Sequence, residues 1–137
     1  MPRVEPQFDQ RLIGVWSTDR LRAAGSATHA RMLFMPSFSG RYETWHNGLN
    51  EVITFRWSPP APDRLTLSGI TYQFRDPPHV RTEPCDWHFE AVPYKLTDGR
   101  DAAGADVPVL ELRFGPTRVD RYGLMTRNFS GFEQPSF

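Results

Sequence analysis

The chain has 137 residues and a formal net charge of zero, because sixteen Asp and Glu balance sixteen Lys and Arg. This length predicts a single domain over residues 1–137 that can close one core without disulfides or metal, and an aromatic content of 13% excludes a disordered chain. The balanced charge argues against nucleic acid and against an anionic membrane surface as partners, since both are bound through a basic excess.

Short strand-like runs between turn signals extend along most of the chain. Thirteen prolines and ten glycines punctuate it, and no long stretch has helical periodicity. This pattern predicts an all-β fold, a single antiparallel up-and-down β-barrel of about eight strands with one or two short helical turns. We expect strands at 12–17, 29–35, 38–46, 49–58, 64–75, 86–96, 107–114 and 119–127, helical turns at Gln7–Leu12 and Thr18–Ala24, and loops at 76–85 and 97–106.

The first hairpin is predicted to turn at Asn47-Gly48, because a type I′ turn needs positive φ and Asn-Gly adopts it readily. A two-residue connection fixes the pairing and divides the side chains into an aromatic row and a polar row. The aromatic row pairs Phe38 with Trp57, Gly40 with Phe55, Tyr42 with Ile53, Thr44 with Glu51 and His46 with Leu49. We expect this row to face the lumen, with the Phe55 ring lying over the bare backbone of Gly40.

The central strands are less regular. The hydrophobic alternation of 64–75 changes phase partway along, which predicts a β-bulge near Ser68-Gly69. Trp87 and Phe89 share a parity that would turn both inward, and Pro93 interrupts their strand. The sequence leaves open which rows of 29–35, 64–75 and 86–96 face inward.

The last hairpin is predicted to turn at Pro116-Thr117 through another two-residue connection. That register pairs Leu112 with Arg121, so Arg121 would face the lumen. A guanidinium keeps its charge, and a buried one needs an anion or several acceptors. The partner is either a ligand carboxylate or an internal carboxylate of Glu51 or Glu90.

A helical turn followed by Gly14-x-Trp16, at the start of the first strand, resembles the signature of the lipocalins and of the wider calycin superfamily. In those barrels the Trp plugs the closed end and an Arg of the last strand covers it. Arg127, inward by the predicted register, stands at the matching position. The resemblance implies a closed end built from Gly14, Trp16 and Arg127, with Arg127 stacked on the Trp16 ring. Trp16 fits an ordinary core position equally well.

Up-and-down topology brings the connections at 18–28, 47–48, 76–85 and 115–118 to one rim, which we expect to be the mouth. Aromatic walls with a few polar groups suit a small-molecule site. The candidate ligand-binding residues are Tyr42, His46, Phe55, Trp57 and Arg121, although His46, like Thr44 and Glu51, also fits a solvated rim position. His79, Cys85, Asp86 and His88 lack the convergent spacing of a metal site, so we expect no metal and no cofactor.

These observations predict a barrel that binds a small, largely apolar molecule bearing a polar or acidic group. The expected location is the cytoplasm, because Cys85 has no disulfide partner, residues 1–10 hold no signal-like apolar stretch and no apolar run approaches about 20 residues. A set of basic residues with a single Lys suggests bacterial, high-GC coding. One alternative is a cyclase or isomerase with His46 or Glu51 as acid or base, for which no catalytic motif is present. The other is a protein-interaction module without a cavity.

Overall fold

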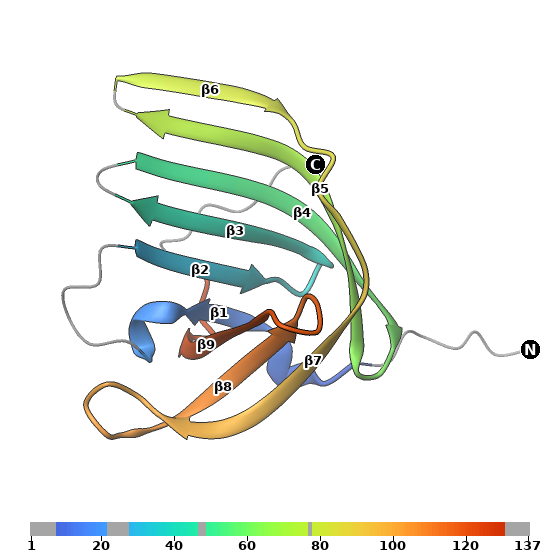
Figure 1. Ribbon diagram of the computed structural model, residues 1–137, viewed down its shortest axis with the longest axis vertical. Helices are drawn as coiled ribbons and strands as arrows, with labels where there is room; N and C mark the ends of the chain where they lie inside the picture. Colours follow the sequence, from blue (N-terminus) through green and yellow to red (C-terminus); the bar gives the residue numbers. More distant parts are fainter. Residues whose placement is uncertain (1–7, 22–27, 47–48, 77, 131–137) are drawn as a thin grey trace, which may run out of the picture.

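The computed structural model describes residues 8–21, 28–46, 49–76 and 78–130. These residues form nine strands and two 3₁₀ turns, drawn in Figure 1. In chain order the elements are η1 (Gln10–Leu12), β1 (Gly14–Ser17), η2 (Thr18–Arg20), β2 (Thr28–Phe34), β3 (Ser39–His46), β4 (Leu49–Ala61), β5 (Arg64–Asp76), β6 (His79–Pro84), β7 (His88–Arg100), β8 (Asp106–Arg113) and β9 (Val119–Thr126). The predicted all-β class and all eight predicted strands are confirmed.

Eight of the strands close into one antiparallel, up-and-down barrel. Their order around the ring is β4-β3-β2-β1-β9-β8-β7-β5, and pairing of β4 with β5 completes the ring. Closure pairs the edges that an open sheet would expose. It also turns the inward row of every strand toward one core, where Trp16, Phe34, Phe55, Trp57, Leu67, Leu110 and Leu112 are among the buried residues.

The ninth strand, β6, corrects the prediction of a loop over 76–85. It pairs with the second half of β5, from Asp76 opposite His79 to Thr71 opposite Pro84, whereas the first half of β5 pairs with β7. β6 therefore lies outside the closed ring, at the end of the sheet order and at the top of Figure 1. All six of its residues are exposed, so it lacks the hydrophobic alternation by which sequence reasoning finds strands.

Smaller local predictions hold in part. The 3₁₀ turn η1 lies within the predicted Gln7–Leu12 turn, and η2 begins at Thr18 with Ser17 as its N-cap; residues 22–24 of the second predicted turn lie outside the described residues. The predicted loop 97–106 is shorter than expected, because β7 pairs with β8 as far as Arg100 opposite Asp106. The bulge predicted near Ser68-Gly69 is confirmed. Thr54 of β4 pairs with Thr71 of β5, whereas the next residue, Phe55, pairs with Gly69, so the register shifts by one residue at Ile70.

The predicted register of the first hairpin is confirmed over its described length. β3 and β4 pair from Ser39 opposite Arg56 to His46 opposite Leu49. Phe55 covers Gly40 so closely that a Cβ there would lie 2.3 Å from the ring and 2.8 Å from the Leu33 carbonyl oxygen. This contact packs β4 closely against β3 at Gly40.

The predicted register of the second hairpin is wrong by one residue. The Phe114 amide donates to the Arg118 carbonyl at 3.0 Å, so the connection has three residues rather than two. Leu110 consequently pairs with Tyr122, and Glu111 with Arg121. Because side chains alternate along a strand, a slip of one residue exchanges the two faces: Tyr122 is buried in the lumen with 2% of its surface exposed, and Arg121 faces outward and forms an ion pair with Glu111 at 3.2 Å.

The closed end combines the three residues of the lipocalin-like motif with η1. Trp16 is fully buried, and its indole N–H donates to the Leu12 carbonyl at 2.8 Å. Arg127 donates through one guanidinium nitrogen to the carbonyls of Arg11 and Ile13, each at 2.6 Å. Arg127 thus binds the carbonyls that a short helical turn leaves without partners, where a stack on the Trp16 ring was expected.

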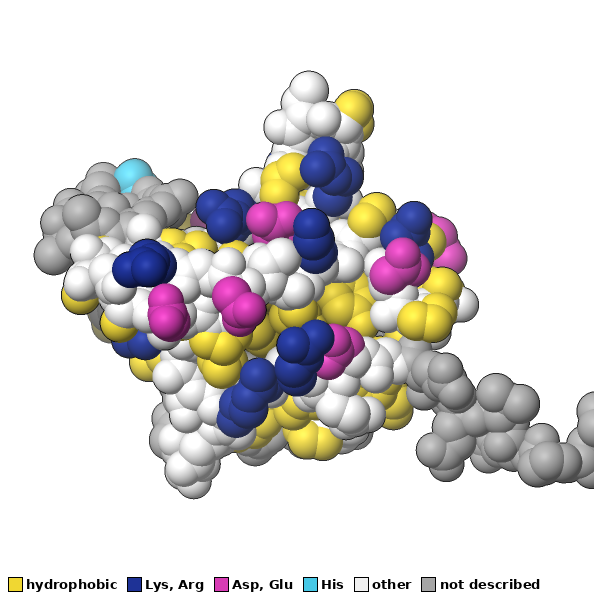
Figure 2. All heavy atoms as spheres, turned by 90° about the horizontal axis from the view of Figure 1, so that it is seen from below, with side chains coloured by type: hydrophobic (Ala, Val, Ile, Leu, Met, Phe, Trp, Pro, Cys, Tyr) yellow, Lys and Arg dark blue, Asp and Glu magenta, His cyan; other side chains and the backbone are white. Residues whose placement is uncertain are grey.

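The outer surface mixes charges of both signs. The face in Figure 2 shows Arg and Lys side chains next to Asp and Glu, with apolar side chains between them. None of the helical segments in the described ranges has the length and apolar character needed to span a bilayer.

We predict that Gly40→Ala destabilises the protein by about 1–3 kcal/mol, because the added methyl displaces the Phe55 ring from a filled core. Urea unfolding followed by Trp fluorescence measures this. The matched control is Gly115→Ala, since a Cβ at Gly115 meets no atom within 4 Å. Equal stability of the two variants would contradict the packing described for the first hairpin.

Candidate functional site

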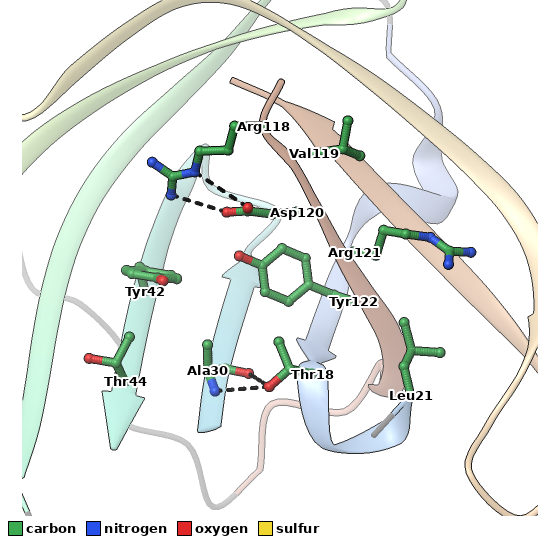
Figure 3. A pocket seen from close by; sticks show the side chains of 10 residues that line it. All are labelled: Thr18, Leu21, Ala30, Tyr42, Thr44, Arg118, Val119, Asp120, Arg121 and Tyr122. Atoms are coloured by element: carbon green, nitrogen blue, oxygen red, sulfur yellow. Dashed lines mark hydrogen bonds and ion pairs between the residues drawn. The ribbon is translucent and has the colours of Figure 1, made fainter. Parts of the chain in front are cut away.

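A pocket of about 470 Å³ opens at the end of the barrel where β1, β3 and β8 run out. Ten residues from β2, β3, β9, η2 and their connections line it, as Figure 3 shows. They are Thr18, Leu21, Ala30, Tyr42, Thr44, Arg118, Val119, Asp120, Arg121 and Tyr122. The predicted mouth rim is therefore hollowed, and a volume of this size matches a small-molecule site.

Aromatic side chains fill the lumen next to this pocket. Trp87 crosses the barrel from the β7 side and stacks on Tyr42, with ring centroids 6.2 Å apart and planes inclined by 15°. The row continues edge to face from Trp87 to Phe89 at 4.8 Å and from Phe89 to Phe114 at 5.0 Å. Edge-to-face and stacked contacts hold rings in defined orientations; among these aromatic residues, Tyr42 is the one that lines the pocket.

Two tyrosines face each other at this pocket. Tyr42 projects from β3 and Tyr122 from β9, and in Figure 3 the Tyr122 hydroxyl points toward the Tyr42 side. Burial raises the pKa of Tyr122 far above its ordinary value, and the neighbouring Tyr42 and Asp120 raise it further. Burial also raises the pKa of Tyr42, with Asp120 as the next cause. Both phenols therefore keep their protons at neutral pH and act as hydrogen-bond groups.

An ion pair closes one side of the pocket. Arg118 donates to the two carboxylate oxygens of Asp120, from Nε at 3.4 Å and from a terminal nitrogen at 3.2 Å. The hydrogen bond to Asp120 raises the pKa of Arg118, and the guanidinium carbon lies 4.9 Å from the centre of the Phe114 ring. The charge of Arg118 is thus balanced by the Asp120 carboxylate, and its guanidinium packs on the Phe114 ring.

The opposite wall of the pocket is formed by hydroxyl groups and backbone. Thr18 Oγ1 accepts from the Ala30 amide at 3.0 Å and donates to the Ala30 carbonyl at 3.3 Å. This reciprocal pair ties η2 to the end of β2, which keeps the Ala30 methyl and the Thr44 hydroxyl at the pocket surface. This wall thus presents the Ala30 methyl as a small apolar area and the Thr44 hydroxyl as a polar group beside it.

The predicted site residues are distributed over three environments. Tyr42 lines the pocket, whereas Phe55 and Trp57 are buried deeper in the core. His46 is exposed at the end of β3. Glu51 is also exposed and lies near Tyr72 of the neighbouring strand, whose pKa is raised first by burial and then by the Glu51 charge. Arg121 lines the outer margin with its guanidinium turned away from Tyr42 (Figure 3), so the inward orientation that its ligand-anchor role required is not found.

Sequence reasoning missed Tyr122, Asp120 and Arg118. All three belong to the inward row of the last hairpin once the connection is counted as three residues. The signal for this row is the alternation of Tyr122 with Leu124 opposite apolar residues such as Leu110, which the assumption of a two-residue turn overrides.

The loose polar group of 79–88 does not converge. His88 lies between Ser68, at 3.1 Å, and Glu90, at 2.8 Å, on the outer face of the barrel. Within the described ranges, no three His, Cys, Asp or Glu side chains gather as metal ligands.

Comparison of the chain with protein-family models, with curated proteins and with solved structures gives no match.

We predict that the protein loses stability as the pH rises above about 10, the ordinary pKa of tyrosine in an unfolded chain. The raised pKa of Tyr122 means that its neutral form stabilises the fold below that pH, and that the unfolded state gains by ionising above it. Urea unfolding at pH 8 and pH 10.5, with tyrosinate absorbance as a second readout, measures the loss.

The variant Tyr122→Phe should flatten this pH dependence, because it removes the buried ionisable group and keeps the ring. Tyr72→Phe is the matched control, since Tyr72 is much less buried than Tyr122. A pH dependence unchanged in Tyr122→Phe would contradict the buried position of this phenol.

Proposed function

We propose that this protein is a calycin-like barrel that binds a small, largely apolar molecule at its mouth, through a neutral polar group such as a carbonyl or hydroxyl. The observation that carries the proposal is the pocket of about 470 Å³ lined by a pair of protonated tyrosines, of which Tyr42 stacks on Trp87. The closed eight-stranded ring, the buried Trp16 and the hydrogen bonds of Arg127 to the backbone around η1 support the calycin likeness.

The apolar part of the pocket lining favours an apolar ligand body. Leu21, Ala30 and Val119, with the rings of Tyr42 and Tyr122, present surfaces that cannot form strong hydrogen bonds. Burial of apolar area against these side chains stabilises the complex by roughly 25 cal/mol per Å².

The polar groups select for an uncharged partner. The Asp120 carboxylate accepts from two of the five N–H groups of Arg118 and balances its charge. A ligand carboxylate would share Arg118 with Asp120, so the attraction of the cation and the repulsion of the neighbouring carboxylate would largely cancel. The Tyr42 hydroxyl can donate to a carbonyl without disturbing this pair. The preference therefore moves from the acidic ligand expected from an inward Arg121 to a neutral one.

Two naphthalene probes test the charge preference. N-phenyl-1-naphthylamine is neutral, and 1-anilinonaphthalene-8-sulfonate carries the same frame with a sulfonate. We expect the neutral probe to bind saturably, with blue-shifted emission, and at least about tenfold more tightly than the sulfonate, because the sulfonate loses hydration and shares its cation with Asp120. Tighter binding of the sulfonate would contradict the neutral-ligand proposal.

Two variants with the same substitution locate the probe. Ala30→Trp places an indole in the pocket and should weaken the neutral probe at least about tenfold, since the new ring occupies its volume. Ala103→Trp adds the same indole to the exposed 101–105 loop and should change nothing. If neither variant alters binding, the mouth pocket is not the site; if no probe binds, the interaction-module alternative is favoured.

A third pair of variants tests the polar anchor. The probe 6-propionyl-2-dimethylaminonaphthalene carries a ketone whose emission shifts to the red on accepting a hydrogen bond. Tyr42→Phe should weaken this probe by about 2–10-fold, the value of one neutral hydrogen bond, and should remove the red shift while leaving N-phenyl-1-naphthylamine unaffected. Tyr72→Phe, on the neighbouring wall, serves as the control.

A further inference from the structure

Among the described strands β6 has a free edge, and the charges of its sequence are complementary to those of a second copy run in the opposite direction. We propose that two copies of this chain associate by antiparallel pairing of their β6 strands, with Thr82 of one copy opposite Thr82 of the other. The proposal does not depend on the function of the mouth pocket.

β6 has one neighbour among the described strands, β5, and its other edge is open. All six residues from His79 to Pro84 are exposed, and Val80 exposes 60% of its surface although it is apolar. An open edge presents backbone N–H and C=O groups in the geometry of a strand, which is the template for a further strand.

The direction of those backbone groups can be assigned. The Cys85 amide donates to the Ile70 carbonyl of β5 at 3.1 Å. Because successive residues of a strand direct their backbone groups to opposite edges, Arg81 and Glu83 also direct theirs to β5. Val80, Thr82 and Pro84 direct theirs to the open edge. Pro84, which has no N–H, thus sits where no donor to β5 is lost.

A second copy fits this edge in one register. With Thr82 opposite Thr82, the two Thr82 residues exchange both backbone hydrogen bonds, and the Val80 amide of each copy donates to the Pro84 carbonyl of the other. Arg81 of each copy then lies opposite Glu83 of the other, in the non-hydrogen-bonded position where facing side chains come closest. Two opposite-charge pairs and a Thr–Thr pair result.

The neighbouring registers are unfavourable. Sliding one copy by two residues sets Arg81 opposite Arg81, or Glu83 opposite Glu83, and like charges directly opposite each other destabilise a strand pair. Sliding by one residue sets a residue whose backbone groups face β5 opposite one whose groups face the edge, so the hydrogen bonds are lost. Within one chain Arg81 and Glu83 are 3.8 Å apart, with 68% and 52% of their side chains exposed, so both are accessible to a second copy.

The same charges restrict the partner. Charged side chains and a proline on an edge strand commonly prevent pairing with arbitrary strands. Here the order Arg81-Thr82-Glu83 is matched by a second copy of the strand run in the opposite direction, because each Arg81 then meets a Glu83. The area is small for a stable interface, so we expect a weak, reversible dimer.

Sedimentation of the full chain over a wide concentration range tests the association. We expect a monomer–dimer equilibrium in the micromolar to millimolar range for an interface of this size. Thr82→Pro removes the central edge donor and should abolish the dimer, whereas Thr82→Ala keeps the donor and should retain it. Both variants lose the hydrogen bond that the Gln73 side chain of β5 donates to the Thr82 hydroxyl, so they are matched on that side. A chain that stays monomeric up to about 1 mM overturns the proposal.

Charge exchange tests the register. Arg81→Glu and Glu83→Arg should each weaken self-association at least about tenfold, because each converts both charge pairs to repulsion. An equimolar mixture of the two variants should associate as a heterodimer, and the double exchange in one chain should restore the homodimer. Circular dichroism and thermal melting check that each variant keeps the fold. A dimer indifferent to these exchanges lies at another surface and overturns the proposal.

Discussion

The three-residue connection between Phe114 and Arg118 decides the chemistry of the barrel mouth. The Phe114 amide closes it on the Arg118 carbonyl, and every residue of β9 takes its face from that closure. Because the side-chain period of a strand is two, the connection has two outcomes. One turns Arg121 inward with the flanking aliphatic residues, and the other turns Tyr122 and Asp120 inward and sends Arg121 to Glu111. The second outcome leaves no unpaired charge in the lumen, since Asp120 meets Arg118 at the rim. The pocket is polar but neutral for this reason.

Aromatic packing then limits how deep the site can be. Trp57, Phe34 and Phe55 interlock in the core, with Phe34 lying 5.6 Å from Trp57 and 5.9 Å from Phe55 between ring centres. Trp87 joins this group through Phe55 at 5.6 Å. Close-packed interiors leave few voids larger than a water molecule. These rings fill the lumen as a core, and the mouth pocket lies at the end lined by η2, β2, β3 and β9. The stable closed end and the shallow mouth are two parts of one packing arrangement.

Much of the fold could be predicted from the sequence, because the strongest signals are local. Asn47-Gly48 predicts a two-residue turn, and this turn length predicts the β3–β4 register that is observed from Ser39 opposite Arg56 to His46 opposite Leu49. Gly-Pro-Thr at 115–117 is compatible with a two-residue or a three-residue connection, so the last register could not be fixed in this way. Arg127 was placed at the correct end, but its partners are backbone carbonyls of η1. Such acceptors belong to every residue, and no side-chain pattern announces them.

The position of β6 and the stacking of Trp87 on Tyr42 both depend on how β5 pairs with its neighbours. Between Ser68, which pairs with His88, and Thr71, which pairs with Pro84, the opposing chain passes through Cys85 and Trp87. Gly69 makes this passage possible, since a Cβ there would lie 2.8 Å from the Cys85 sulfur and 2.9 Å from the Trp87 Cβ. The close approach separates one long strand into β6 and β7. It aims Trp87 across the lumen onto Tyr42, and it leaves β6 beyond the ring with an open edge. A larger residue at 69 would push Trp87 away from Tyr42 and would also shift β6 against β5. The Trp87–Tyr42 stack and the open edge of β6 therefore depend on the same bare backbone.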